Sequence, residues 1–158
     1  MVKQQARAMP TRAELRVWRS YIETSEVLRS RLASQLQSES SLSAGDYQVL
    51  LALSEAEGKT LRSSELAEII GWERSRLSHH LGRMQKREFV ERARCLDDPH
   101  GIDVTATDLG LRAFRSGSVP HLRAVRELFI DALAPEQLAV LDDLNRVLRT
   151  HLDLEPMD

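Results

Sequence analysis

Two short helical patterns lie almost back to back in the middle of the chain, and this pair constrains the fold more than any other feature. The first covers residues 63–70 and the second about 74–87, with only a short Gly-Trp turn between them. Residues 89–95 then alternate loosely in the manner of a strand, and 102–106 alternate again after a turn at 96–101. The chain therefore carries a tight helix pair followed by a hairpin.

A long amphipathic helix precedes this central unit. Apolar residues at steps of three or four predict it over about 11–38, and Thr11 with Glu14 forms a capping box at its start. A second capping box, Ser43 with Asp46, predicts a short apolar helix that continues through LLAL. Both signals place helix starts ahead of the central pair.

Further start signals follow along the chain. Ser63 or Ser64 is expected to cap the first helix of the central pair, and Thr107 to cap the helix after the hairpin. That later pattern is disturbed near 117–120, so we expect a local interruption there. Pro135, at an N1-like position, opens the last helix.

Together these elements predict a mainly α chain with a small β-hairpin wing, that is, a winged helix-turn-helix with N- and C-terminal dimerisation helices. We expect residues 1–40 and 118–158 to form the dimerisation helices and 41–117 the winged lobe, in one compact domain of 158 residues. No apolar run reaches about 20 residues, the N-terminus lacks an apolar signal-peptide core, and Cys95 has no cysteine to pair with. These features predict a cytoplasmic protein without a transmembrane segment.

Charge is distributed unevenly along the chain. The formal net charge is −2, yet the segment from Lys59 to Arg94 holds nine Lys and Arg against five Asp and Glu. The rest of the chain is correspondingly acidic. A basic middle between acidic ends is the electrostatic pattern of a localised nucleic-acid interface.

The helix at about 74–87 has two unlike faces. At 100° per residue, Leu81 and Met84 fall within about 40° of Leu77 and form an apolar stripe with it. The opposite side carries small, basic and donor-rich residues: Ser75, Arg76, His79, Gly82, Arg83 and Lys86. Such a face fits a groove lined by phosphates and base acceptors, although a solvated charged face is the alternative interpretation.

Each residue on that face has an expected part in DNA binding. Arg76 has the geometry to read guanine O6 and N7, and Ser75 and His79 can donate to bases or phosphates. Gly82 allows the backbone to approach closely. Arg83 and Lys86 are expected to bind phosphates.

At this point the sequence resembles the MarR family of bacterial transcriptional regulators. The resemblance runs from about Glu14 to Leu152 and is carried by LSAGDYQVLLALSEAEG, LRSSELAEIIGWERSRLSHHLGRMQKREFVERARCLDDPHGIDVTATDLG and FIDALAPEQLAVLDDLNRVL. Trp72, just before the second helix of the pair, is similar to the actinobacterial branch. The resemblance implies a triangular homodimer that binds a pseudo-palindromic operator in double-stranded DNA, usually as a repressor. It also implies that a small, often phenolic, effector or an oxidant releases the protein from DNA.

The DNA-contacting residues expected on these grounds are Ser63, Ser64, Arg74, Ser75, Arg76, Ser78, His79, Arg83, Lys86, Arg92, Arg94 and His100. His100 departs from the family pattern. The wing of family members commonly reads Asp-x-Arg-Gly, whereas this chain has Asp98-Pro99-His100-Gly101. A neutral histidine lacks the permanent charge favoured in a narrow minor groove. Either His100 still enters the groove, or Arg92 and Arg94 supply the wing's phosphate contacts and the stretch is a plain turn.

Effector sensing is less well marked. Trp18, Tyr21, Asp46 and Tyr47 are candidates to line a ligand cleft, although Trp18 also fits an apolar stripe and Asp46 a capping box. Cys95 raises a redox-responsive alternative, and the five histidines a metal-responsive one, but no metal-ligand spacing is found.

No catalytic motif is found, so we expect neither an enzyme nor a cofactor. A protein-binding winged-helix adaptor remains as an alternative from another class. The basic middle of the chain favours DNA over this adaptor.

Overall fold

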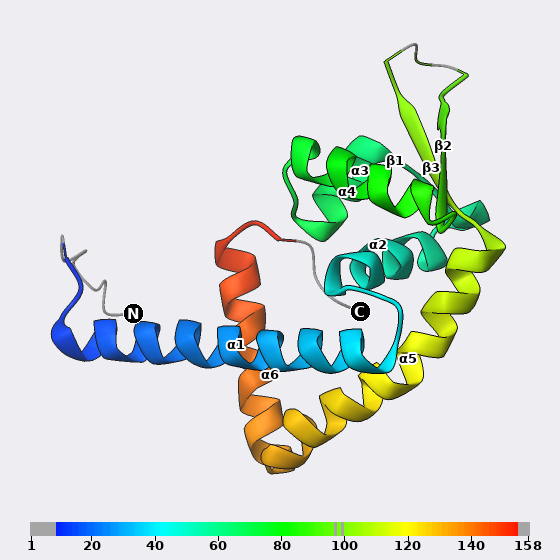
Figure 1. Cartoon of the computed structure of the whole chain (residues 1–158). Helices are drawn as coiled ribbons and strands as arrows, with labels where there is room; N and C mark the ends of the chain where they lie inside the picture. The colour runs from blue at the N-terminus through cyan, green and yellow to red at the C-terminus, as the bar shows by residue number, and fades with distance from the viewer. Residues whose placement is uncertain (1–8, 97, 99, 155–158) are drawn as a thin grey trace.

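The computed structural model describes residues 9–96, 98 and 100–154, and its elements follow the expected order (Figure 1). These are α1 (Arg12–Glu39), α2 (Ala44–Glu55), η1 (Glu57–Lys59), β1 (Thr60–Arg62), α3 (Ser63–Ile70), α4 (Arg74–Lys86), β2 (Val90–Arg94), β3 (Ile102–Ala106), α5 (Asp108–Leu128), η2 (Ile130–Ala132) and α6 (Pro135–His151). The prediction of a mainly α chain with a small wing is confirmed. Residues 1–8 and 155–158 of the expected dimerisation segments, and Asp97 and Pro99 of the wing turn, lie outside the described residues.

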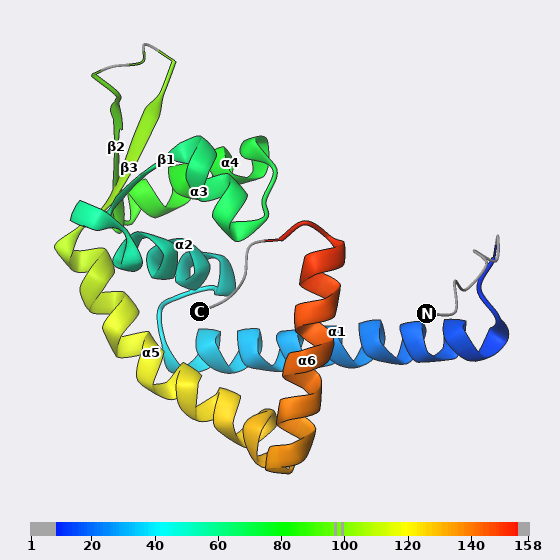
Figure 2. The same cartoon turned by 180° about the vertical axis from the view of Figure 1, so that it is seen from behind.

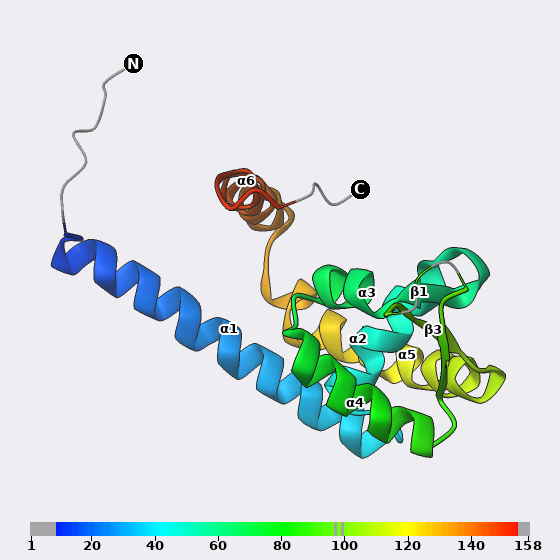
Figure 3. The same ribbon diagram turned by 90° about the horizontal axis from the view of Figure 1, so that it is seen from above.

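Helices α2, α3 and α4 and the sheet form one lobe, from which the β2–β3 hairpin projects as the wing (Figure 1). The long α5 leaves this lobe and leads to α6, and α1 packs against α5. Seen from behind, the turn between α5 and α6 lies at the opposite end of the molecule from the wing tip (Figure 2). The view from above shows α1 extending well beyond the lobe (Figure 3).

The sheet has three antiparallel strands in the order β1-β3-β2, whereas the sequence predicted only the hairpin. The missed strand, Thr60–Arg62, is too short for its alternation to be detected. It pairs Thr60 with Thr105, and their hydroxyl oxygens lie 2.8 Å apart. Along β3, Val104 is buried as expected, but Ile102 is exposed, because it lies toward the projecting tip of the wing.

The predicted capping boxes are confirmed. Thr11 accepts from the N–H of Glu14 at 3.2 Å, and the Glu14 carboxylate accepts from the N–H of Thr11 at 2.6 Å. Ser43 and Asp46 make the same reciprocal pair at the start of α2, at 3.1 and 2.9 Å. Thr107 caps α5 by accepting from the N–H of the third helical residue at 3.0 Å.

Two expectations about helix boundaries were wrong. Ser63 and Ser64 do not cap α3; the N-cap is Arg62, without a side-chain cap hydrogen bond, and both serines lie in the first helical turn. Helix α5 also runs without interruption through Gly117 and Pro120. Gly117 is buried, and a Cβ there would lie 3.2 Å from Leu42, so the break in the apolar pattern reflects close packing.

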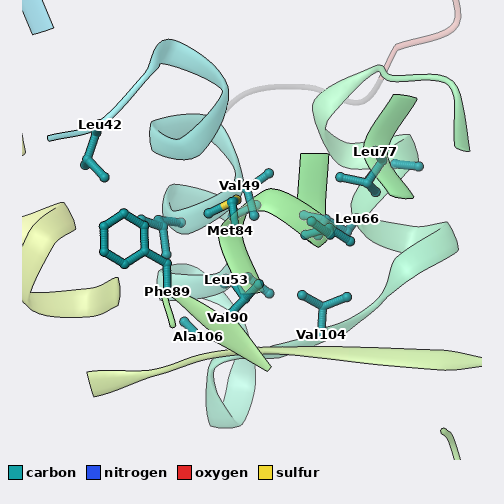
Figure 4. Packing of buried hydrophobic residues seen from close by; sticks show 14 of the residues in the cluster. Leu42, Val49, Leu53, Leu66, Leu77, Met84, Phe89, Val90, Val104 and Ala106 are labelled. Atoms are coloured by element: carbon teal, nitrogen blue, oxygen red, sulfur yellow. The ribbon is translucent and has the colours of Figure 1, made fainter. Parts of the chain in front are cut away.

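The core of the lobe joins all of its elements. Each helix of the lobe, both strands of the hairpin and the loop after α1 contribute buried side chains (Figure 4). Those labelled in the figure are Leu42, Val49, Leu53, Leu66, Leu77, Met84, Phe89, Val90, Val104 and Ala106. Burial of each large apolar side chain stabilises the fold by about 1.5–3 kcal/mol, so this core fixes α4 against α2 and the sheet.

Helices α1 and α6 are much less covered. No residue of α6 is buried, and Leu36 is the single buried residue of α1. Between α1, the end of α5 and the start of α6 lies an apolar groove of about 750 Å³. Among the described residues, no helix is both long enough and apolar enough to cross a membrane.

Gly110→Ala is expected to destabilise the fold, because a methyl group there would collide with the main-chain carbonyl of Phe89. Overpacking against a backbone that cannot move aside predicts a loss of about 2 kcal/mol in the free energy of unfolding, measured by urea denaturation. Gly82→Ala is the control, since its new Cβ would lie 3.9 Å from Arg92. Because alanine has a higher helix propensity than glycine, Gly82→Ala should raise the free energy of unfolding by about 0.5–1 kcal/mol. Equal losses of stability in both variants would contradict the steric argument.

Candidate nucleic-acid interface

Helix α4 presents the two faces predicted from its sequence. Leu77, Leu81 and Met84 are buried in the core of the lobe. Seven of the expected DNA-contacting residues are exposed along the helix: Arg74, Ser75, Arg76, Ser78, His79, Arg83 and Lys86. The first turn of α4 carries no acidic residue, so the positive end of the helix dipole and the basic side chains both make the electrostatic potential positive at this end of the helix.

Arg76 is held by an aromatic ring although it is exposed. Its guanidinium carbon lies 4.1 Å from the ring centroid of Trp72, which closes the turn between α3 and α4. A planar guanidinium over an indole face is a favourable cation–π contact that leaves the N–H donors at its edge available. The sequence suggested a role for Arg76 but gave no sign of this stack.

His80 was not among the expected site residues, and it is the main functional candidate that the sequence analysis missed. Its side chain is buried on the inner face of α4. Nδ1 lies 3.0 Å from Nη2 of Arg83, and Nε2 lies 3.0 Å from Oδ1 of Asp46. The contact between Nε2 and that carboxylate is an electrostatic one, and Nε2 has no hydrogen-bond partner among the described residues. The sequence did indicate the burial of His80, because a helical wheel places it about 60° from Leu77, on the side that faces the core.

Asp46 is the most deeply buried charged group of the lobe, at 1% exposure. Arg87, just after α4, donates from Nη1 to its Oδ2 at 2.7 Å and from Nη2 to the carbonyl of Ser41. Burial alone would raise the pKa of Asp46, but the contacts with His80, the N–H of Ser43 and Arg87 outweigh burial and hold the pKa far below its usual range. The carboxylate is therefore charged at neutral pH and joins α2 to the middle of α4 and to the residue after its C-terminal end.

The wing adds basic side chains beside α4. Only Val90 of β2 is buried, and Arg92 and Arg94 are exposed. Nε of Arg92 donates to Oε1 of Gln85 in α4 at 2.7 Å, which ties the base of the wing to that helix. The structure thus brings Arg92 next to α4, with Arg94 exposed farther along the same strand.

At the wing tip, Asp98 organises the turn. Its carboxylate accepts from the N–H of His100 at 3.0 Å and lies 3.6 Å from Nη1 of Arg62. The main chain of His100 is therefore part of the turn, and its side chain is exposed. Ser63 and Ser64, at the start of α3, are half-buried.

The four candidate ligand residues are not brought together. Trp18 and Tyr21 are exposed on α1, and Tyr21 lines the large groove beside α6. Asp46 is taken up by its ion pairs. Tyr47 lines a different cavity of about 180 Å³ between α1, α2 and α5, where its ring centroid lies 4.5 Å from that of His121.

Cys95 and the histidines have ordinary environments. The buried thiol of Cys95 donates to Asp103 at 2.9 Å, and this hydrogen bond raises the pKa of the thiol and so disfavours the reactive thiolate. Within the described part of the chain, no three His, Cys, Asp or Glu side chains gather as a metal site would need.

Asp46→Asn is expected to lower the free energy of unfolding by about 2 kcal/mol at neutral pH, because it leaves Arg87 and His80 without their charged partner. The folded-state pKa of Asp46 is lowered, so its contribution is complete above the unfolded pKa of about 4 and is lost as the pH falls below it. Urea denaturation at a series of pH values should therefore show the two proteins converging in acid. Asp143→Asn, which removes an exposed ion pair on α6, is the control and should change the free energy of unfolding little. A difference in stability between Asp46→Asn and the wild type that does not vary with pH would contradict the role assigned to Asp46.

Comparisons with known proteins agree with this geometry. The sequence model of the MarR family matches residues 40–98. AbsC, a MarR family transcriptional regulator from Streptomyces coelicolor, is 36% identical with a TM-score of 0.84, over 93% of this chain and 99% of AbsC. Sco3205, a MarR family transcriptional regulator from the same organism solved in complex with DNA, is 35% identical with a TM-score of 0.85, over 96% and 94%. Comparison with curated proteins finds no match.

A more distant structure is similar as well. The PcaV transcriptional regulator of S. coelicolor, solved with its natural ligand, is 25% identical with a TM-score of 0.68, over 92% of this chain and 98% of PcaV. The similarity to AbsC and Sco3205 extends over nearly the full length of each chain, far beyond the lobe. Members of the family are transcriptional regulators, which confirms the expectation that the protein is not an enzyme. By fold, sequence and extent of similarity, this chain belongs to the MarR family of winged-helix transcriptional regulators.

Proposed function

We propose that this protein is a cytoplasmic repressor that binds a pseudo-palindromic operator as a homodimer. In this proposal α4 of each protomer enters the major groove and the wing lies along the adjacent backbone. Two copies of α4 would then contact half-sites about 34–36 Å apart, one turn of B-DNA. A small molecule releases the protein from DNA.

The two-faced character of α4 is the observation that carries the proposal. Its apolar side is fixed in the core, while Arg76, Arg83 and Lys86 stand exposed on the outer side. Arg92 and Arg94 extend the same basic character onto the wing. The structure of Sco3205 with DNA supports the same use of this lobe here.

The uncovered terminal helices support the homodimer and the proposed division of the chain. An apolar stripe on α6 is solvent-exposed in the single chain, with Leu144 at 56%, Val147 at 68% and Leu148 at 46% exposure. A monomer leaving so continuous an apolar stripe in water would be unfavourable, and a second copy of the same helices covers it symmetrically. Residues 1–40 and 118–158 therefore serve as the dimer base and 41–117 as the DNA-binding lobe.

The cavity beside Tyr47 supports effector release. Arg29 and Gln48 also line it, and Nδ1 of His121 is buried there without a hydrogen-bond partner among the described residues. Burial lowers the pKa of His121, so the ring is neutral at physiological pH. A small aromatic ligand with one polar group fits a site of this size and lining. It would lie between α1 of the dimer base and α2 of the lobe.

The alternatives have less support. The hydrogen bond from Cys95 to Asp103 opposes a redox switch at that thiol. A protein-binding adaptor would need no basic outer face on α4. The arginine variants below distinguish the adaptor from the regulator.

Arg76→Ala should relax base preference and cost about 1–3 kcal/mol on the preferred site, because in this proposal Arg76 reads base edges. Arg83→Ala should weaken binding to all sequences about equally and reduce the salt slope by about one, because it loses a phosphate contact. Selection from random duplexes and salt-dependent affinity measurements test both. Arg115→Ala is the matched control, since α5 lies on the other side of α2 from α4 (Figure 1). Unchanged selection by both variants would favour the adaptor.

Leu144→Glu should convert the dimer to a monomer, because it places a charge in the exposed apolar stripe of α6. Ala139→Glu adds the same charge on the polar side of the helix and should leave the dimer intact. Sedimentation velocity at several protein concentrations measures both. A wild-type protein that sediments as a monomer would disprove the homodimer.

A further inference from the structure

Two exposed arginines of α4 contact one aromatic pair, the half-buried Trp72 and the buried His80. The rings of Trp72 and His80 meet edge to face, with centroids 5.2 Å apart. Arg76 stacks on Trp72, and Arg83 contacts Nδ1 of His80. Arg76 and Arg83, two of the side chains proposed to contact DNA, therefore each have one partner within this pair.

The first turn of α2 supports the pair from the side away from DNA. A Cβ at Gly45 would lie 2.8 Å from Cε1 of His80 and 2.8 Å from Cη2 of Trp72, so the absence of a side chain there lets both rings approach. Asp46 lies 3.0 Å from Nε2 of His80 and is itself held by Arg87 at 2.7 Å. The imidazole is thus fixed by α2, and α2 is fixed by the core.

The partners of His80 define where its proton lies. A guanidinium only donates, so Nδ1, 3.0 Å from Arg83, must act as an acceptor. An Nδ1 that accepts from Arg83 leaves the ring N–H on Nε2, which lies 3.0 Å from the carboxylate of Asp46.

We infer that His80 is a positioning residue for DNA recognition, which holds Arg83 in its DNA-binding orientation by linking it to Asp46. The inference rests on the proposed function, because Arg83 needs a phosphate to bind. A free arginine side chain loses much conformational freedom when it binds. The contact with His80 restricts Arg83 before DNA arrives, so less entropy is lost on association.

Two variants separate this role from a merely structural one. In His80→Asn, the amide oxygen can occupy the place of Nδ1 and accept from Arg83, but nothing reaches Asp46. In His80→Gln, the amide nitrogen can occupy the place of Nε2 and face Asp46, but the acceptor for Arg83 is lost. Both variants remove the ring, so they are matched in their lost contact with Trp72.

The probe is a duplex selected from a random library by the wild-type protein, and its dissociation constant is measured at one fixed salt concentration. We expect His80→Gln to weaken binding about 3- to 10-fold, the effect of one lost hydrogen bond, and His80→Asn to stay within about twofold of wild type. Thermal midpoints should rank in the opposite order, because His80→Asn is the variant that loses Asp46. In the Arg83→Ala background the two His80 variants should bind equally.

Equal losses of affinity in both variants, or affinities that rank with the thermal midpoints, would overturn the inference while leaving the proposed function intact. A persistent effect of His80→Gln in the Arg83→Ala background would overturn it as well. If the wild-type protein selects no duplex, the proposed function itself is wrong. Nitrogen-15 chemical shifts of His80 in the free protein give an independent measurement, since a proton on Nδ1 would exclude the contact with Arg83.

Discussion

The ion pair between Asp46 and Arg87 is the interaction on which the DNA-binding lobe depends. A carboxylate at 1% exposure is tolerable only with charged or donor partners, and here they come from α2, α4 and the residue after α4. The pair therefore fixes both the position and the tilt of α4 relative to α2. An apolar contact alone would fix them less strictly. An ion pair of this kind contributes specificity of packing more than net stability.

The lobe and the dimer base meet different physical demands. The lobe has its own apolar core, so it can hold α4 rigidly. In the base, by contrast, no residue of α6 is buried in the single chain, as the proposed homodimer requires. Since α5 runs unbroken from the lobe to the base, a change in how the two protomers of the proposed dimer meet would move both copies of α4 relative to each other. The cavity beside Tyr47, between α1 and the lobe, lies where a ligand could bias that geometry.

Much of this fold was predictable because its signals are local. Capping boxes span four residues, and the stripe of Leu77, Leu81 and Met84 lies within three helical turns, so both were found from spacing alone. The strand at Thr60–Arg62 was not, because three residues show no period. The network around His80 was missed for another reason: its partner Asp46 lies far away in the sequence, and only the packing of α2 on α4 brings them together. Likewise, Pro120 predicted a break that tertiary packing overrides.

The exposed and buried charges of this lobe should respond differently to salt. In the proposed complex with DNA, the contacts of Arg83 and Lys86 with phosphates would be exposed, so counterions would weaken them steeply. Asp46 and His80 are buried, although the Arg87 side chain is 40% exposed, so salt screens the contacts among these three residues less. If the proposed function is right, a higher ionic strength should lower the affinity for DNA while the arginines stay positioned. The preference between sequences, which in the proposal depends on Arg76 and its neighbours, should then be less sensitive to salt than the affinity.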